Sequence, residues 1–310
     1  MAKRTLRNKT RISTLAPADF EKLFNDKLPR NIRSQIKKYG LKYREVTAKE
    51  RDESIKRIVD ALLDKGLAYS GQHRKKQWEK GWGQNLTEGS VIPHYFGKYP
   101  FIRVNQRFIR PVSRNFEYNM IGVVLDWVFD RYMKGTKNIY EFGCGTGHNL
   151  LRLRKVNPAA NLWGLDWVFS SQKIIRKFAR TSGDKKLFAY RFDYFNPDHN
   201  FVLAHDSIAC TIASLEQVGS KYKKFVAYLL KNKPKLCINI EPIAELFDER
   251  NLLDYFALEY HKKRRYLDGY LTYLKKLEKQ KKIKIHRIQR TCVGSFFNEG
   301  YQVVVWSPVK

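Results

Sequence analysis

The stretch Asn138-Ile139-Tyr140-Glu141-Phe142-Gly143-Cys144-Gly145-Thr146-Gly147-His148-Asn149-Leu150 decides the fold of this chain. A short apolar segment is followed by an acidic residue near its end, by three glycines at alternate positions, and by residues that favour a helix to about Val156. Glycines in such a turn permit positive φ angles and let a ligand lie directly on the backbone. The stretch therefore predicts a strand, a ligand-binding turn and a helix.

The spacing and the charge of this turn narrow the class of ligand. Gly143, Gly145 and Gly147 alternate, whereas a dinucleotide-binding fingerprint places its third glycine further along the chain. The carboxylate of Glu141 would repel a pyrophosphate, but it would attract a ligand that carries an ammonium and a sulfonium group. These features favour S-adenosylmethionine as the ligand.

The segment Glu141-Phe142-Gly143-Cys144-Gly145-Thr146-Gly147 resembles the first motif of the class I S-adenosylmethionine-dependent methyltransferases. The second expected element is an acid at the end of the next strand that holds the ribose hydroxyls, roughly twenty residues further on. Asp166 stands at that position, after Leu162-Trp163-Gly164-Leu165. The resemblance covers about residues 116–310 and implies methyl transfer from S-adenosylmethionine. The alternative is a structural turn in an unrelated α/β domain.

Downstream of the glycines, strand-like and helix-like segments alternate regularly, which predicts an α/β fold with a doubly wound, mainly parallel sheet. The strands are expected at 138–142, 161–165, 187–192, 207–213 and 235–240, with helices near 148–156, 170–180 and 219–231. Two further β-rich runs, 283–290 and 301–306, predict a C-terminal antiparallel hairpin. Together these segments resemble the seven-stranded methyltransferase fold.

The chain before this domain divides by composition. Residues 1–16 are basic and predict a flexible tail, and residues 17–115 predict a module of helices and irregular segments. Within that module, residues 70–115 mix aromatic and basic side chains with repeated glycines and prolines, which is typical of a lid or pocket wall, or of an irregular connector. The methyltransferase domain is expected at 116–310, with a helical insertion at 241–282 on the acceptor side.

Ligands of doubly wound sheets lie at the carboxyl ends of the parallel strands. The resemblance therefore implies a cofactor site in which Glu141 lies near the ligand's amino group, Asp166 holds the ribose and Trp167 packs against the adenine. Asp193 would accept from the adenine amino group, although it could instead cap a turn. The full set of expected cofactor-binding residues is Glu141, Gly143, Cys144, Gly145, Gly147, Asp166, Trp167, Asp193, Tyr194 and Ser214.

Three residues are candidates for catalysis. Glu216 follows the fourth strand and could act as a general base or hold a substrate hydroxyl, or it could cap the next helix. Glu241 follows the fifth strand and brings a second carboxylate to the same rim. His261, beside a cationic run in the insertion, is a candidate neutral base, and the alternative is a solvated helix face.

The charge of the chain bears on its partners. The 310 residues include 60 Lys and Arg against 30 Asp and Glu, a formal net charge of +30. This imbalance favours polyanionic partners, although a lysine-rich surface without a partner would give the same count. We expect a small or glycan-like acceptor, neutral or anionic, methylated on oxygen or nitrogen. The alternatives are an RNA methyltransferase and a non-catalytic protein that binds S-adenosylmethionine.

The remaining composition points to a cytoplasmic protein without metal. Four scattered cysteines form neither a disulfide framework nor a CxxC pattern, which suits a reducing compartment. No apolar run reaches the roughly 18 to 20 residues that a membrane helix needs, and no signal-peptide core follows the basic N-terminus. The seven histidines do not cluster with cysteines or carboxylates at ligand spacing, so no metal is expected.

Overall fold

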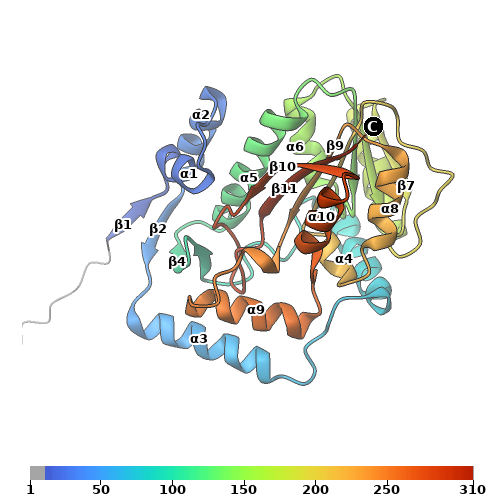
Figure 1. The fold of residues 1–310 in the computed structure, drawn as a ribbon. Helices are drawn as coiled ribbons and strands as arrows, with labels where there is room; N and C mark the ends of the chain where they lie inside the picture. The colour runs from blue at the N-terminus through green and yellow to red at the C-terminus, as the bar shows by residue number, and fades with distance from the viewer. Residues whose placement is uncertain (1–10, 310) are drawn as a thin grey trace, which may run out of the picture.

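The main sheet of the computed structural model, which describes residues 11–309, has seven strands in the order β10-β11-β9-β8-β5-β6-β7 (Figure 1). The five strands from β5 to β9 pair in parallel, and β11 pairs antiparallel with both β9 and β10. The strands are β5 (Asn138–Phe142), β6 (Asn161–Asp166), β7 (Leu187–Arg191), β8 (Ile208–Ile212), β9 (Leu236–Glu241), β10 (Ile283–Gln289) and β11 (Gln302–Pro308). This arrangement confirms the predicted fold class.

Alternating side chains along the strands build a hydrophobic core on each face of the sheet. Along β5, Ile139 packs in one core cluster, while Tyr140 and Phe142 pack in the other. The first cluster is covered by α5 (Phe116–Val128), α6 (His148–Val156) and α7 (Phe169–Ser182), and the second by α8 (Lys223–Asn232) and α10 (Tyr270–Lys279). Since helices cover both faces, the carboxyl ends of the parallel strands remain as the natural place for a site.

A second, four-stranded antiparallel sheet precedes the main domain, in the order β1-β2-β4-β3. Its strands are β1 (Ile12–Thr14), β2 (Lys42–Glu45), β3 (Ile102–Val104) and β4 (Arg107–Pro111). Asn105 and Gln106, which join β3 to β4, both have positive φ, as a two-residue hairpin turn requires. The chain between β10 and β11 runs along β3, with a bridge from Val104 to Val293, and so connects the two sheets.

The prediction of a flexible tail over residues 1–16 is wrong for residues 12–15. Ile12–Thr14 forms β1, which pairs with β2, and the side chain of Leu15 enters the core with 6% of its surface exposed. The tail residues 1–10 lie outside the described residues. The main-chain bond from the Leu15 N–H to the Leu41 carbonyl shows why the segment is ordered, since it pairs with backbone distant in sequence.

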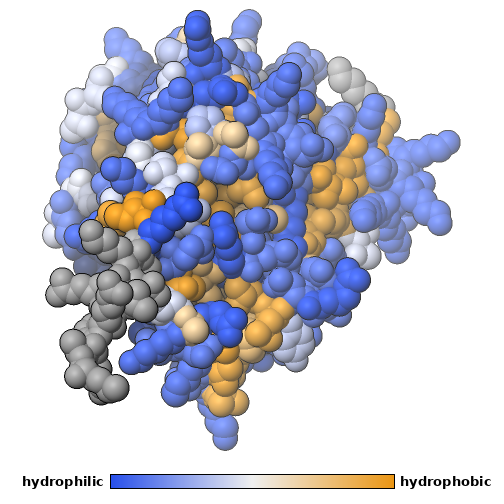
Figure 2. Space-filling view, turned by 90° about the vertical axis from the view of Figure 1, so that its left-hand side faces the viewer, coloured by the Kyte–Doolittle hydropathy of each residue, from blue (hydrophilic) through white to orange (hydrophobic). Residues whose placement is uncertain are grey.

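Residues 17–69 contribute three helices to the N-terminal module: α1 (Pro17–Phe24), α2 (Arg30–Tyr39) and α3 (Ala48–Leu63). The buried side chains of α1 and α2 belong to the same core cluster as α5. The helix α3 packs along α9 (Leu252–Arg264) of the insertion, as Figure 1 shows. The face that this module presents is mostly hydrophilic, with apolar areas between the charged side chains (Figure 2).

Residues 70–115 are more regular than the sequence indicated. A 14-residue helix, α4 (Lys75–Glu88), follows the short 3-10 turn η1 (Gln72–Arg74), and β3 and β4 complete the segment. Gly81 and Gly83 lower the intrinsic helix preference of this stretch, but neither has an atom within 4 Å of a would-be Cβ. Tertiary packing of α4 against α7 therefore decides its conformation.

Candidate functional site at the carboxyl ends of the parallel strands

The glycine loop lies between the end of β5 and the start of α6, and all three of its glycines have positive φ: 70° at Gly143, 53° at Gly145 and 74° at Gly147. The N–H groups of Gly143 and Cys144 donate to the Leu165 carbonyl at 2.6 and 3.1 Å. A Cβ on Gly143 would lie 2.5 Å from Cβ of Ser214. The loop therefore needs glycine both for its backbone conformation and for the room that it leaves.

Asp166 ends β6 directly beside this loop, with 5% of its surface exposed. Its Oδ2 accepts from the Gly145 N–H at 2.9 Å, and its Oδ1 accepts from the Val168 N–H at 3.2 Å. Burial raises the pKa of Asp166 to about 6, and the backbone donors oppose that rise. The carboxylate is therefore largely ionised at neutral pH and retains lone pairs for a ligand.

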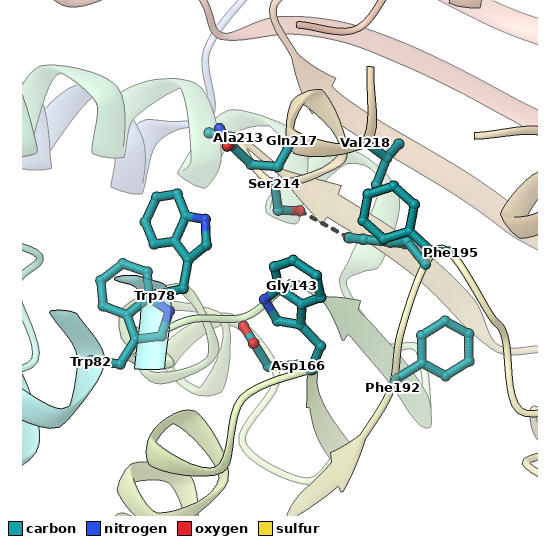
Figure 3. A pocket seen from close by; sticks show the side chains of 12 residues that line it. Trp78, Trp82, Gly143, Asp166, Phe192, Phe195, Ala213, Ser214, Gln217 and Val218 are labelled. Atoms are coloured by element: carbon teal, nitrogen blue, oxygen red, sulfur yellow. Dashed lines mark hydrogen bonds between the residues drawn. The ribbon is translucent and has the colours of Figure 1, made fainter. Parts of the chain in front are cut away.

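A pocket opens between these two strand ends and the turn after β8 (Figure 3). It is lined by Trp78, Trp82, Gly143, Asp166, Trp167, Phe192, Tyr194, Phe195, Ala213, Ser214, Gln217 and Val218. Figure 3 shows the two indole rings of α4 on one wall and the phenyl rings of Phe192 and Phe195 on the opposite side. The pocket thus combines aromatic walls with a few polar groups, as ligand sites generally do.

The polar rim of the pocket is held by a short chain of hydrogen bonds. The hydroxyls of Tyr194 and Ser214 lie 2.9 Å apart, and Ser214 Oγ also donates to the Phe142 carbonyl at 3.0 Å. The backbone of Ser214 is in turn fixed by Glu241, which accepts its N–H at 3.1 Å. The rim is therefore positioned before any ligand binds.

The helix α4 is fastened to both loops that form the pocket. Glu79 accepts hydrogen bonds from the N–H groups of Phe169 (2.7 Å) and Ser170 (2.8 Å), at the start of α7. Beyond the other end of α4, the Thr146 hydroxyl donates to the Val91 carbonyl at 2.6 Å. The ring of Trp82 reaches to 3.0 Å from the position of a Cβ on Gly145. Thus α4 covers the glycine loop.

Three of the expected cofactor-binding residues lie beneath or beside the pocket. Glu141 is 1% exposed, accepts from Asn149 Nδ2 at 2.7 Å, and has its pKa raised to about 8 by burial. Cys144 is buried, with its Sγ 3.4 Å from the Ser171 hydroxyl. Asp193 accepts from the Phe195 N–H at 2.9 Å and faces a neighbouring hollow instead of the pocket. The remaining expected residues line the pocket or form the glycine loop.

The two glutamate candidates for catalysis lie together at the turn after β8. Glu241 is fully buried, and its carboxylate accepts from the N–H groups of Ser214, Leu215 and Glu216 at 3.0 to 3.2 Å. Burial, and then the charge of Glu216, raises the pKa of Glu241 to about 8. Burial raises the pKa of Glu216 to about 7, and its Oε1 accepts from Gln217 Nε2 at 2.8 Å. Glu241 therefore shapes the turn, and Glu216 lies next to Gln217, whose side chain lines the pocket.

His261 lies in another groove, which is walled by α9 and by the chain before α4. That groove shares Phe195 and Val218 with the pocket described above. Nε2 of His261 lies 3.2 Å from Nδ2 of Asn298, and burial lowers the pKa of the imidazole to about 3. His261 is thus uncharged at neutral pH and set apart from the glycine loop.

From the sequence, Trp78 and Trp82 were placed only in the aromatic segment at 70–115, and Gln217 and Phe195 were given no role in the site. The two tryptophans are four residues apart, which is the spacing that places side chains on one helical face. Their rings stack with centroids 5.3 Å apart. The spacing was visible in the sequence, but the contact of α4 with α7 was not.

The described residues 11–309 contain no helix long and apolar enough to cross a membrane. In the same range, no three His, Cys, Asp or Glu side chains gather as a metal site would require. The four cysteines are free thiols.

Comparisons with known proteins give matches among solved structures, while no family model and no curated protein matches the sequence. The chain is similar to a magnesium protoporphyrin IX methyltransferase from Synechocystis solved with S-adenosylmethionine, at 12% identity and TM-score 0.44, over 63% of this chain and 81% of that one. The N,N-8-amino-8-demethyl-D-riboflavin dimethyltransferase from Streptomyces davawensis matches at 11% identity and TM-score 0.44, over 63% of this chain and 57% of that one. A small RNA methyltransferase matches at 14% identity and TM-score 0.48, over 66% of this chain and 28% of that one.

Proposed function

We propose that this protein is a methyltransferase that uses S-adenosylmethionine as its methyl donor. One observation carries the proposal: three left-handed glycines at the end of β5 face the buried carboxylate of Asp166 at the end of β6. The two strands are neighbours in the parallel sheet, so their carboxyl ends bring both features to one pocket. This pairing suits a ligand whose ribose binds to Asp166 while another part of the same molecule lies against the backbone of the glycine loop.

The residues present fit this donor on three counts. Gly143 leaves a space that a Cβ would fill, because such a Cβ would meet Ser214. Asp166 has carboxylate lone pairs beyond the two that backbone N–H groups occupy, and a ribose diol can donate to them. The rings of Trp167 and Tyr194 supply flat apolar surface for an adenine, and indole faces attract a sulfonium cation.

When bound, the donor supplies a methyl carbon that its sulfonium has already activated for displacement. The residues of this chain then have to align the acceptor and keep water away. Orientation of this kind can lower a barrier by about 7 to 11 kcal/mol. The cover formed by Trp78 and Trp82 suits the exclusion of water from the pocket.

We assign to Glu216 the role of holding or deprotonating the acceptor group. Its pKa of about 7 lies near physiological pH, which is where a general base works best. Glu241 positions it, since it accepts the Glu216 N–H at 3.2 Å. The role of His261 as a further base stays a prediction from the sequence, and its groove lies beside the donor pocket.

The acceptor that we propose is a small or glycan-like molecule, methylated on oxygen or nitrogen, in the cytoplasm. The pocket is lined mainly by aromatic and small side chains that suit a compact molecule, and the adjoining groove adds charged side chains, among them Lys221, Lys262 and Arg265. Free thiols at all four cysteines support a reducing compartment.

An acceptor screen tests this function. Purified protein is incubated with S-adenosylmethionine and panels of sugars, sugar acids, phenols, amines and RNA, and release of S-adenosylhomocysteine is measured. We expect turnover with a small molecule, and a loss of about a hundredfold in Glu216→Gln, the low end for general-base catalysis. The control Glu53→Gln, on the exposed face of α3, should keep full activity.

Two outcomes of this screen would contradict the proposal. Turnover on RNA alone, falling steeply as salt rises, would show an RNA methyltransferase. Donor binding without turnover on any acceptor would show a binding protein that keeps the fold.

A further inference from the structure

A groove of about 980 Å³ lies beside the donor pocket and contains His261. Its size is near the upper end of the roughly 300–1,000 Å³ that small-molecule sites occupy. Phe195 and Val218 line both cavities, so the groove and the donor pocket share a wall. Val218 also ends η3 (Leu215–Val218), the short turn that carries Glu216. A molecule in this groove would therefore have one end next to that turn.

Three segments that are distant in the sequence form most of the groove: residues 69–73 of the N-terminal module, residues 218–221 at the end of η3, and residues 244–268 of the insertion. The Ser70 N–H donates to the Arg264 carbonyl at 2.8 Å, and the Ser70 hydroxyl donates to the Arg265 carbonyl. A Cβ on Gly219 would lie 2.8 Å from the same Arg265 oxygen, so only glycine lets the turn approach so closely. The groove is therefore built before any ligand binds.

The Lys, Arg, Asp and Glu side chains that line this groove balance in charge, unlike those of the chain as a whole. Three are cationic and three are acidic: Lys221, Lys262 and Arg265, and Glu245, Glu249 and Asp268. The whole chain has 60 Lys and Arg against 30 Asp and Glu, so the groove has a larger acidic share. Carboxylates repel an anionic ligand, and an apolar ligand would remove charges from water without replacing their hydration. The lining therefore favours an uncharged, polar ligand.

Arg265 is held beside the groove by its backbone and by an aromatic ring. It is the C-cap of α9 with a φ of 51°, a left-handed conformation in which helices usually have glycine. Its guanidinium lies 4.1 Å from the centroid of the Tyr69 ring, and Tyr69 is itself 40% exposed. Within residues 11–309, the side chains of Arg265 and Asp268 form no ion pair or hydrogen bond. Both therefore line the groove with hydrogen-bonding groups that a ligand can use.

An uncharged sugar chain matches this lining best. Each sugar hydroxyl both donates and accepts hydrogen bonds, so it can bind to carboxylate, guanidinium and ammonium groups alike. Hydrogen bonds to charged groups are stronger than those between neutral groups, which offsets the water that the hydroxyls lose. The rings of Tyr69, Tyr266 and Phe195 add flat apolar surface for the C–H faces of sugar rings.

We propose that this groove binds the methyl acceptor, and that the acceptor is an uncharged sugar chain whose hydroxyl groups bind to Arg265 and Asp268. The word acceptor rests on the proposed function, whereas sugar binding rests on the groove itself. The sugar unit at the shared wall of Phe195 and Val218 is the one presented to the donor. Tyr69 and Arg265 line the groove but not the donor pocket, so they bind units further along the chain.

Sugar binding can be measured without the donor. Saturation-transfer NMR of the full chain is recorded with trisaccharides of glucose, galactose, mannose and N-acetylglucosamine, with trigalacturonic acid as an anionic sugar, and with a short single-stranded RNA. The thermal midpoint and the calorimetric binding of S-adenosylmethionine are measured in parallel on each protein.

Each groove variant has a matched control. Tyr69→Ala is compared with Tyr255→Ala, because Tyr255 is an exposed tyrosine of α9 that does not line the groove. Arg265→Gly is compared with Lys233→Gly, because Lys233 is also a left-handed C-cap, with a φ of 49° at the end of α8. Lys233 does not line the groove either.

We expect at least one neutral trisaccharide to bind to the wild type and to both controls, and trigalacturonic acid and RNA to bind more weakly. Tyr69→Ala and Arg265→Gly should weaken that binding about tenfold or more, as the loss of a hydrogen bond to a charged group does. Arg265→Gly should unfold at or above the wild-type midpoint, because glycine suits a left-handed C-cap. Its lost binding is then due to the missing side chain, and donor binding should be unchanged in every variant.

The sugar proposal is wrong if no trisaccharide binds to the wild type, or if all the variants bind it equally. Tighter binding of trigalacturonic acid or RNA than of the neutral sugars would also overturn it, because the groove would then hold a polyanion. Donor binding that falls together with sugar binding in both groove variants would refute a separate acceptor subsite. Absence of donor binding to the wild type would instead refute the methyltransferase proposal, while the sugar result would still decide what the groove binds.

Discussion

The N–H of Gly145 donates to Oδ2 of Asp166 across 2.9 Å and thereby joins the loop after β5 to the end of β6. The two residues are separated by a helix in the sequence, and they meet because β5 and β6 are parallel neighbours. The proposed donor site is thus one connected structure, in which a change in the glycine loop also affects the acid that would hold the ribose.

Gly143→Ala should close the donor pocket as well as strain the backbone. Its φ of 70° costs an alanine roughly 1–2 kcal/mol, and the contact of the new Cβ with Ser214 adds about 1–3 kcal/mol. Gly183→Ala is the matched control, because Gly183 has a φ of 66° with no atom within 4 Å of a Cβ. Urea unfolding and donor titration should show a larger loss of stability in Gly143→Ala, and loss of donor affinity there alone. Equal behaviour of the two variants would contradict the role of Gly143.

Glu141→Gln should change how stability depends on pH. Burial raises the pKa of Glu141 from 4.5 to about 8, so between these values the folded protein keeps a proton that the unfolded chain has released. The stability that this proton contributes is complete below about pH 4.5 and is lost as the pH rises toward 8. Glutamine carries no such proton, while its carbonyl can still accept from Asn149.

The measurement is urea unfolding of the wild type and Glu141→Gln at several pH values. We expect the variant to gain on the wild type by roughly 1.4 kcal/mol per pH unit at most within that window. Stability curves that run parallel from pH 5 to 8 would mean that Glu141 ionises normally in the folded protein.

Glu79→Ala should weaken both the start of α7 and the closure of the pocket. Glu79 accepts the first two N–H groups of α7, whose own N-cap residue, Val168, supplies no side-chain acceptor. Loss of a cap of this kind costs about 0.5–2 kcal/mol. Donor affinity should also fall, since Trp78 and Trp82 are carried on the same helix.

The comparison for this prediction is Glu88→Ala, at the far end of α4, where the glutamate pairs with His94 at the surface. That variant should keep both thermal stability and donor affinity near the wild-type values. If the two variants reduce donor affinity equally, α4 does not act on the pocket through Glu79.

The main sheet could be predicted from the sequence because its signals are local. The strand at 138–142 has the predicted bounds, because its apolar run is followed directly by glycines, which favour a turn. Asp166 could be found because its place at the end of the next strand fixes its position in space. The helix at 148–156 also has its predicted bounds.

The rest depended on contacts between distant segments. The helix α4 contains two glycines and is stabilised by packing on α7, so no local signal indicated it. Glu241 looked like a catalytic carboxylate in the sequence, yet three backbone N–H groups occupy it.

The most direct test of the account is calorimetric titration of S-adenosylmethionine into the wild type, into Asp166→Ala, and into Asp60→Ala, whose carboxylate is on the surface of α3. We predict clear binding to the wild type and to Asp60→Ala. Asp166→Ala should bind more weakly by about 1.5–3 kcal/mol, the usual worth of a hydrogen bond to a charged group. No binding to the wild type, or equal binding to all three proteins, would contradict the assignment of the glycine loop and Asp166 as the donor site.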